Sequence, residues 1–445
     1  MAIAQQPPIA PVSQFIPPVP HSIDATGLSL GFLSDLVNKL LYVEGEQSGY
    51  IIAEKVGLPF VGVVERVLDF LKSEKYIEIK GSSGLGPASY NFALSQRGIE
   101  KAHEDMNRNQ YVGPAPIPHA LYVSGVAAQS ITQVNITLDD VIQAFSHLVI
   151  SRQLLEQIGP ALNSGKSVFL FGPPGNGKTT IAEIGASLLG GEIFVPHAIE
   201  FDGKIIKVYD PVYHQLGSGA AVPDRRGYDG RWVLSKRPVV ITGGELTLTT
   251  LDLIYNETSK YYEAPVQMKA NGGLFMIDDF GRQQVSPRDL LNRWIVPLEK
   301  RIDYLTLHTG QKMEIPFDEL IMFSTNLEPQ NLVDEAFLRR IRYKINVRPP
   351  TLEQYREIFR RMCERRNIAY NERALNYILQ EYYQKRNLQL RSCQPRDLLD
   401  QLIDQARFLK LEPALTKHLI DLACESYFVS MDKLSSGEQT LAKVT

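Results

Sequence analysis

Hydrophobic and polar positions change their spacing twice along this chain. Between residues 137 and 348, short apolar runs alternate with segments whose apolar residues recur every three or four positions. Runs such as 167–171, 274–277 and 320–325 are apolar almost throughout, which is typical of strands buried on both faces of a parallel sheet. The sequence therefore predicts an α/β domain over 137–348, in which helices cover a parallel sheet.

After Pro349 and Pro350 the spacing is helical, and it predicts a helical domain over 349–432. Residues 433–445 are predicted to be a flexible tail. The four amphipathic segments of the helical domain are Glu353–Arg366, Glu372–Arg386, Pro395–Leu409 and Leu415–Ser430.

The N-terminal third has a third pattern. Residues 28–110 predict three helices, the last beginning at Pro59, followed by a β-hairpin with strands at 76–80 and 90–94. This order resembles a winged helix-turn-helix, which implies a small α+β domain. Residues 1–27 carry six prolines and are predicted to be a disordered leader, and the proline-containing stretch 111–136 is predicted to be a linker.

Composition and charge add constraints on compartment and partners. The 445 residues carry a net charge of −3, which gives no electrostatic reason to expect non-specific binding to nucleic acid or membranes. Cys363, Cys393 and Cys424 lack the spacing of a metal site and are expected to be reduced thiols. No stretch approaches the roughly 20 apolar residues that span a bilayer. A cytoplasmic protein without membrane insertion is therefore predicted.

A glycine-rich loop follows the apolar run 167–171 and opens into a helical pattern. Its glycines allow backbone N–H groups to converge on phosphate oxygens at a helix N-terminus. Lys178 is expected to reach the β- and γ-phosphates, and the Thr179 hydroxyl to ligate Mg²⁺. The loop therefore predicts a site for a nucleoside triphosphate, with the residues Gly172, Pro173, Pro174, Gly175, Asn176, Gly177, Lys178, Thr179 and Thr180.

Polar residues follow two later apolar runs. Asp278 and Asp279 end the run 274–277, at the edge of the sheet where phosphates are expected, so Asp278 is predicted to hold Mg²⁺ and Asp279 to polarise the attacking water. Asn326 ends the run 320–325 and is suited either to orienting that water or to capping a turn.

Three arginines complete the candidate site. Arg339 and Arg340 are either catalytic groups at a subunit edge or a solvated pair on the surface. Arg396 either folds over the γ-phosphate or forms an ion pair within the helical domain.

These motifs, in this order, resemble the AAA+ ATPases over about residues 137–430. The resemblance implies a three-layer αβα core with a C-terminal helical lid, ATP and Mg²⁺ as cofactors, and a homo-oligomeric ring that is expected to be hexameric. It implies Walker A at 172–180, Walker B at Asp278 and Asp279, sensor 1 at Asn326 and sensor 2 at Arg396. It also implies an arginine finger at Arg339 or Arg340, which the sequence does not distinguish.

One position departs from the family pattern. Walker B usually ends in Asp-Glu, whereas this chain has Asp278-Asp279. Asp279 reaches one methylene less far, so hydrolysis is expected to be slow unless the water lies closer. The alternative is that Asp279 only completes the metal shell.

A predicted hairpin over 302–315, just before the sensor-1 strand, resembles the pre-sensor-1 clade. The segment 272–279, followed by Leu291, Asn292 and Arg293, resembles the MoxR-like chaperones of that clade in particular. The overall arrangement faintly resembles ATPases associated with pilus assembly. This implies ATP-driven remodelling of a protein client. Tyr255, Tyr261 and Tyr262 either grip that client or pack internally.

The winged helix has two possible roles. Residues 28–110 carry 9 Lys and Arg against 11 Asp and Glu, whereas DNA binders carry a basic stripe. Docking of a protein client or adaptor is therefore favoured over a DNA-associated regulator or loader. A nucleotide-gated scaffold that barely hydrolyses ATP is the third alternative.

Overall fold

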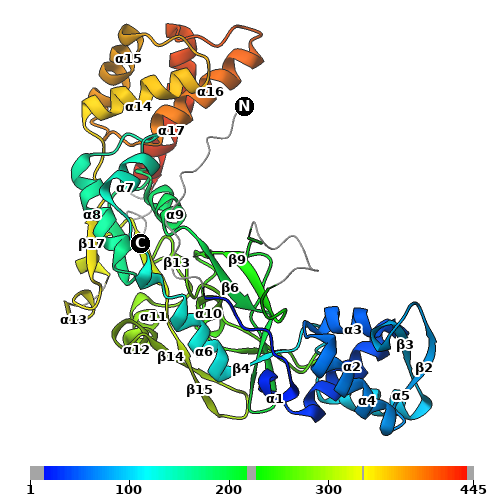
Figure 1. Cartoon of the computed structure of the whole chain (residues 1–445). Coiled ribbons are helices and arrows are strands. Elements are labelled where there is room, and N and C mark those ends of the chain that lie inside the picture. The colour runs from blue at the N-terminus through cyan, green and yellow to red at the C-terminus, as the bar shows by residue number, and fades with distance from the viewer. Residues whose placement is uncertain (1–14, 218–226, 333–334, 438–445) are drawn as a thin grey trace.

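A computed structural model describes residues 15–217, 227–332 and 335–437. The chain forms three parts, with the N-terminal part and the helical C-terminal part at opposite ends of a central α/β part (Figure 1). The central part contains a parallel sheet, and the C-terminal part consists of helices. In the described ranges, no helix is long and apolar enough to cross a membrane.

The N-terminal part packs helices against a small antiparallel sheet of order β1-β3-β2. The predicted third helix begins later than expected, because Gly62 has a φ of +80° and kinks the chain ahead of α4. The elements are α2 (Leu30–Glu44), β1 (Gln47–Ser48), α3 (Gly49–Val56), η1 (Phe60–Val64), α4 (Glu65–Ser73), β2 (Ile77–Ser82), η2 (Pro87–Ser89), β3 (Tyr90–Leu94) and α5 (Gln96–Arg108).

The central sheet is parallel and has the order β10-β13-β16-β5-β17. Leu170 and Met322 lie in a core that includes α7 to α9, whereas Phe169 and Phe323 lie in a second core with α11. The sheet is therefore the middle of three layers. Its strands are β5 (Ser167–Phe171), β10 (Val239–Thr242), β13 (Leu274–Ile277), β16 (Leu320–Thr325) and β17 (Tyr343–Asn346), and the helices are α7 (Leu138–Ala144), α8 (Arg152–Asn163), α9 (Lys178–Leu188), α11 (Pro287–Arg293), α12 (Ile295–Lys300) and α13 (Glu335–Leu338).

A second five-stranded sheet has the order β11-β12-β8-β7-β4. Its strands are β4 (Ile117–Pro118), β7 (Ala198–Phe201), β8 (Lys204–Lys207), β11 (Ile254–Tyr255) and β12 (Tyr262–Glu263). Beside it lie α10 (Val266–Lys269) and two antiparallel strand pairs, β6 (Glu192–Pro196) with β9 (Trp232–Lys236) and the hairpin of β14 (Ile302–Thr306) with β15 (Lys312–Pro316). The β14–β15 hairpin matches the hairpin predicted before the sensor-1 strand.

The prediction of a linker over 111–136 is wrong. This segment contributes β4 to the second sheet, followed by α6 (His119–Ala128) and η3 (Ile131–Gln133). The Tyr122 side chain is 2% exposed, and its hydroxyl accepts a hydrogen bond from Asn271 at 2.8 Å. Prolines can lie in edge strands and at helix starts, which is where Pro118 lies here.

The prediction of a disordered leader is also wrong for residues 15–27, while residues 1–14 lie outside the described range. The Phe15 ring packs edge-on against Phe194 and Trp232, and α1 (Ile23–Thr26) follows. The buried Arg231 guanidinium pairs with Asp229 at 2.8 Å and donates to the Thr26 carbonyl at 2.7 Å. The leader is therefore a strap that joins the N-terminal part to the central part.

The C-terminal part, called the lid below, consists of helices that lie above the central sheet in Figure 1. The predicted flexible tail over 433–445 is wrong for residues 433–437, since the last helix continues to Gly437, and 438–445 lie outside the described range. The elements are α14 (Leu352–Arg365), α15 (Glu372–Ile378), η7 (Leu379–Gln384), α16 (Gln394–Phe408) and α17 (Lys417–Gly437).

Candidate functional site

The glycine-rich loop connects the end of β5 to the start of α9, as its sequence pattern predicts. Gly172, Gly175 and Gly177 have φ values of +139°, +77° and +82°, which residues with a side chain rarely adopt. A Cβ on Gly172 would lie 2.3 Å from the Val347 carbonyl oxygen. A Cβ on Gly177, which caps the N-terminus of α9, would meet nothing within 4 Å. The loop thus leaves open space beside a helix N-terminus, which is suited to phosphate oxygens.

The Lys178 ammonium lies across this loop. Its Nζ donates to the carbonyl oxygens of Gly172 at 2.9 Å and Pro173 at 3.1 Å, and to Asn326 Oδ1 at 2.7 Å. Burial lowers the pKa of Lys178, and the nearby carboxylates Asp278 and Asp279 oppose this shift. A phosphate would favour the charged ammonium further, so this environment fits an anionic ligand.

Thr179 and Asp278 meet where β13 ends. The Thr179 hydroxyl donates to Asp278 Oδ2 at 2.7 Å. One hydroxyl and one carboxylate are the kind of protein ligands that hold Mg²⁺ together with phosphate oxygens and water. Among the described residues, no group of three or more His, Cys, Asp or Glu side chains could hold a metal ion without such additional ligands.

Asp279 and Asn326 are neighbours at the same edge of the sheet. Asn326 Nδ2 donates to Asp279 Oδ1 at 2.8 Å, while its Oδ1 accepts from Lys178. These two contacts fix the orientation of the amide, because a flipped amide would place donor against donor and acceptor against acceptor. Asp279 has a φ of +48°, a left-handed conformation in which Asp is enriched among side-chain-bearing residues. An Asp at this position is therefore compatible with the local backbone.

The lid touches the loop through a segment that the sequence analysis missed. The Cys393 backbone N–H donates to the Gly175 carbonyl at 2.9 Å, and the Ser392 N–H donates to Asn176 Oδ1 at 3.2 Å. Arg391 adjoins the same glycine, because a Cβ there would lie 3.7 Å from Arg391 Cδ. No local pattern marks residues 391–393, since their role depends on how the lid folds over a loop that lies about two hundred residues earlier.

Arg396 lies one turn further along α16 and points elsewhere. Its Nε and Nη2 each lie 2.9 Å from Asp397 Oδ1, and 60% of its side chain is exposed. In this conformation Arg396 forms an ion pair within the lid. The structure thus brings together Lys178, Thr179, Asp278, Asp279 and Asn326, but not Arg396.

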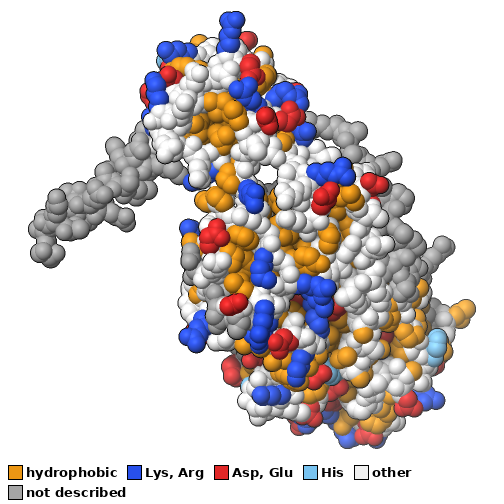
Figure 2. Space-filling view, turned by 90° about the vertical axis from the view of Figure 1, so that its left-hand side faces the viewer, with side chains coloured by type: hydrophobic (Ala, Val, Ile, Leu, Met, Phe, Trp, Pro, Cys, Tyr) orange, Lys and Arg blue, Asp and Glu red, His pale blue; other side chains and the backbone are white. Residues whose placement is uncertain are grey.

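Arg339 and Arg340 lie far from the glycine-rich loop of their own chain. The Arg340 carbonyl accepts a hydrogen bond from Ser167, the first residue of β5, whereas the loop follows the last residue, Phe171. Arg340 Nε is 2.6 Å from Glu299 Oε1, and Arg339 is exposed. Both precede the edge strand β17. β17 lies on the left-hand side of Figure 1, and Figure 2 views the molecule from that side and shows Lys and Arg side chains among Asp and Glu side chains.

The three tyrosines that were candidates for gripping a client have internal partners. Tyr262 is 1% exposed, and Tyr255 stacks on His308 with ring centroids 4.3 Å apart. Tyr261 packs edge-on against Tyr111 of the N-terminal part at 5.7 Å. Their positions match the packing alternative.

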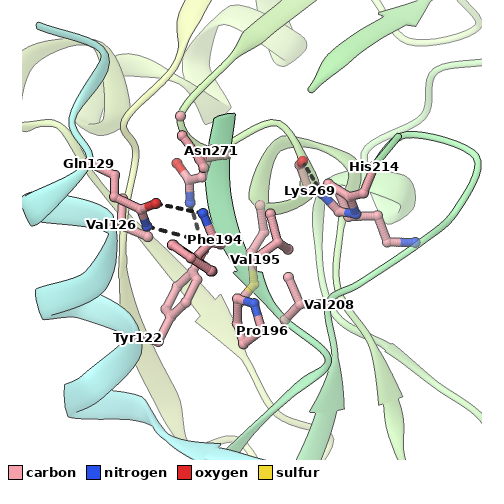
Figure 3. A pocket seen from close by; sticks show the side chains of 13 residues that line it. Tyr122, Val126, Gln129, Phe194, Val195, Pro196, Val208, His214, Lys269 and Asn271 are labelled. Atoms are coloured by element: carbon pink, nitrogen blue, oxygen red, sulfur yellow. Dashed lines mark hydrogen bonds between the residues drawn. The ribbon is translucent and has the colours of Figure 1, made fainter. Parts of the chain in front are cut away.

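A cavity between α6, β6 and α10 is too small to be a substrate site. Its volume is about 20 Å³, which is room for a water molecule. Figure 3 shows that its polar side chains are already engaged: Gln129 bonds to the Phe194 backbone, and His214 bonds to the Lys269 carbonyl. Burial lowers the pKa of His214 to about 4, which keeps the imidazole neutral.

A family model described as a domain of unknown function (DUF8689) matches residues 351–426, within the lid. No curated protein matches the chain.

Two solved structures show a distant likeness. The chain is similar to the Holliday junction branch migration motor RuvB of Thermotoga maritima, with 16% identity, 67% of this chain and 72% of that chain covered, and a TM-score of 0.35. It is also similar to NtrX from Brucella abortus in complex with ADP, with 15% identity, 73% and 65% covered, and a TM-score of 0.38. At these identities and TM-scores the likeness carries no conclusion about activity.

Proposed function

We propose that this protein is an ATPase of the AAA+ type that uses Mg²⁺. The observation that carries the proposal is the network at the ends of β5, β13 and β16: Thr179 with Asp278, and Asn326 between Lys178 and Asp279. Lys178 binds phosphate, and Thr179 and Asp278 would hold Mg²⁺, which would supply positive charge beside the transferred phosphoryl group. Asp279 accepts a proton from the attacking water, and Asn326 holds that water in position.

The proposal includes a ring of identical subunits. Arg339 and Arg340 lie at the end of β5 opposite to the loop, which supports the proposal that they serve the site of a neighbour instead of their own. A contact that joins two different surfaces closes into a ring when its rotation allows. A hexamer is the assembly that the AAA+ resemblance implies.

A mixing experiment tests this arrangement. Lys178→Ala and the double variant Arg339→Ala/Arg340→Ala are expected to be inactive alone. Their equimolar mixture is expected to regain up to about a quarter of the wild-type ATPase rate per subunit, since a quarter of the interfaces then combine an intact loop with intact arginines. A mixture that stays as inactive as its components contradicts a site shared between subunits.

We propose further that the ATPase remodels a protein client, as MoxR-like chaperones do, and that the N-terminal part recruits the client or an adaptor as a winged-helix docking module. The strap and the Arg231 contacts support this role, because a module fixed to the central part transmits movement directly. A link to pilus assembly rests on resemblance alone.

The alternative is a DNA-associated ATPase. In the N-terminal part, Gly62 lies against the His21 carbonyl of the strap and Gly57 against Gly230 of the central part, so the start of the helix that would enter a major groove is covered. This favours a protein client. A gel shift with random duplex at low salt tests the choice: tight binding would support the DNA role, and its absence the client role.

A further inference from the structure

A cleft of about 460 Å³ lies between the N-terminal part and the second sheet of the central part. One wall comes from α2 and the end of α5, and the other from the β7–β8 turn with Tyr255 and Lys260. Its volume is in the range of small-molecule sites, about 300–1,000 Å³. None of its lining residues belongs to the glycine-rich loop or to the network around it.

The charge on this cleft is one-sided. Four basic residues line it, Lys39, Arg108, Lys204 and Lys260, against one acidic residue, Asp35. Asp35 pairs with Lys101 Nζ at 3.0 Å and with Arg108 Nη1 at 3.9 Å, so Lys39, Lys204 and Lys260 are the lining cations outside this pair. A cleft whose walls carry one sign of charge concentrates ions of the opposite sign. The excess of positive charge therefore favours an anionic occupant.

One of these cations is buried, which is costly without an anion. Lys39 is 3% exposed, and its Nζ donates to the carbonyl oxygen and the side-chain Oδ1 of Asn109, at 3.2 and 2.5 Å. Both acceptors are neutral. Burial lowers the pKa of Lys39 to about 8, although Asp105 and Asp35 act in the opposite direction. An anion in the cleft would offset this desolvation.

We propose that this cleft binds a small molecule that carries phosphate groups. Several ammonium groups and a guanidinium suit the multiple charges of a phosphate better than a single carboxylate, and the Phe32 and Tyr255 side chains provide apolar surface for the rest of the molecule. The Tyr255 ring stacks on His308, in the turn of the β14–β15 hairpin. A ligand in the cleft would therefore contact, through Tyr255 and His308, the β14–β15 hairpin that precedes β16 and Asn326.

Isothermal titration of inorganic pyrophosphate into the full-length Lys178→Ala variant tests the proposal, since this background weakens binding at the glycine-rich loop. Saturable binding of one pyrophosphate per chain is expected. Lys204→Glu is expected to weaken it by about tenfold or more, and Lys204→Ala by less, because reversing a nearby charge replaces attraction by repulsion. Lys204 suits this test because it is exposed and lines the cleft. Lys236→Glu, an exposed lysine on β9 outside the cleft, is the matched control and is expected to change nothing.

Three outcomes would overturn the proposal: no saturable pyrophosphate binding, equal weakening by Lys204→Glu and Lys236→Glu, or citrate binding as tightly as pyrophosphate. A short single-stranded thymidine oligonucleotide distinguishes the source of the phosphate. If the oligonucleotide binds much more tightly than pyrophosphate does, and Lys204→Glu weakens that binding, the ligand of the cleft is a nucleic-acid backbone and not a small molecule. If the wild-type protein proves not to hydrolyse ATP, the pyrophosphate experiment still tests the cleft, because the cleft shares no residue with the proposed ATP site.

Discussion

Asn326 contacts a positive and a negative group at once, and its amide cannot do so in any other orientation. Replacing it by alanine leaves Lys178 bonded to the loop carbonyls but leaves Asp279 without this donor. We expect Asn326→Ala to lower ATP turnover about 100-fold or more, as removal of one positioned hydrogen-bond donor does elsewhere, and to change the affinity for ATP only a few-fold.

Single-turnover hydrolysis and a titration with a fluorescent ATP analogue separate these two quantities. Asn292→Ala, an exposed asparagine on α11, is the matched control. An Asn326→Ala protein whose affinity falls as much as its turnover would show that the amide serves binding instead of the chemical step.

Asp279 offers a second test at the scale of one residue. Asn in its place keeps the shape and tolerates the left-handed backbone, but it cannot accept a proton from water. We expect Asp279→Asn to lower turnover about 100-fold or more and to retain ATP binding. Asp404→Asn, on the exposed face of α16, controls for the loss of a charge. Unchanged turnover would mean that Asp279 only completes the metal shell.

At the scale of elements, β16 carries opposite chemistry at its two ends. Asn326 follows its last residue, whereas Glu319 precedes its first and is fully buried, and among the described residues neither of its carboxyl oxygens has a hydrogen-bond partner. Burial raises the pKa of Glu319 well above its usual range, so the folded protein keeps a proton there that the unfolded chain releases. Stability is therefore lost as the pH rises from the unfolded pKa toward the folded pKa.

Glu319→Gln removes this dependence. Over that window, we expect the free energy of unfolding of the variant, relative to wild type, to rise by about 1.4 kcal/mol per pH unit. Urea unfolding at several pH values between 5 and 7 measures it. Glu353→Gln, on the exposed face of α14, is expected to show no such trend. Parallel pH profiles for wild type and Glu319→Gln would contradict a protonated Glu319.

The elements also show how far the sequence predicts this structure. The loop 172–180 and the strands that end in Asp278 and Asn326 were predictable, because a strand, its terminal polar residue and the next helix are local in sequence. The place of β4 in the second sheet was not predictable, because β4 has only two extended residues and is a strand only through its pairing with β7. The proline-rich composition of the strap wrongly predicted disorder, because Phe15 packs against Phe194 and Trp232, which lie far along the chain.

At the scale of the whole molecule, Arg231 connects three parts of the chain. Its guanidinium bonds to Asp229, to the Thr26 carbonyl in the strap and, at 3.4 Å, to the Pro116 carbonyl before β4. Removing one partner of a buried ion pair typically costs about 3–5 kcal/mol, because the other charge is left uncompensated. We expect Arg231→Ala to lose about this much unfolding free energy.

Urea unfolding measures that loss, and limited proteolysis is expected to show faster cleavage near residues 110–118 as the N-terminal part comes loose. Arg152→Ala removes an exposed arginine that pairs with Glu156 on the same helix, and it is expected to cost under about 1 kcal/mol. Equal losses in the two variants would contradict a structural role for the Arg231 contacts.

The strap has a consequence for how the protein is made. The bond between Arg231 and Thr26 spans 205 residues, so Thr26 leaves the ribosome long before its partner exists. At typical synthesis rates this interval is roughly 10 to 40 s. During that time Phe15 and Pro17 lack the segment that covers them in the folded protein, where the Phe15 ring packs against Trp232 and the Pro17 carbonyl accepts a hydrogen bond from the Asp229 N–H. Nascent chains of this protein thus expose a short apolar segment to chaperones until the centre of the sequence has been translated.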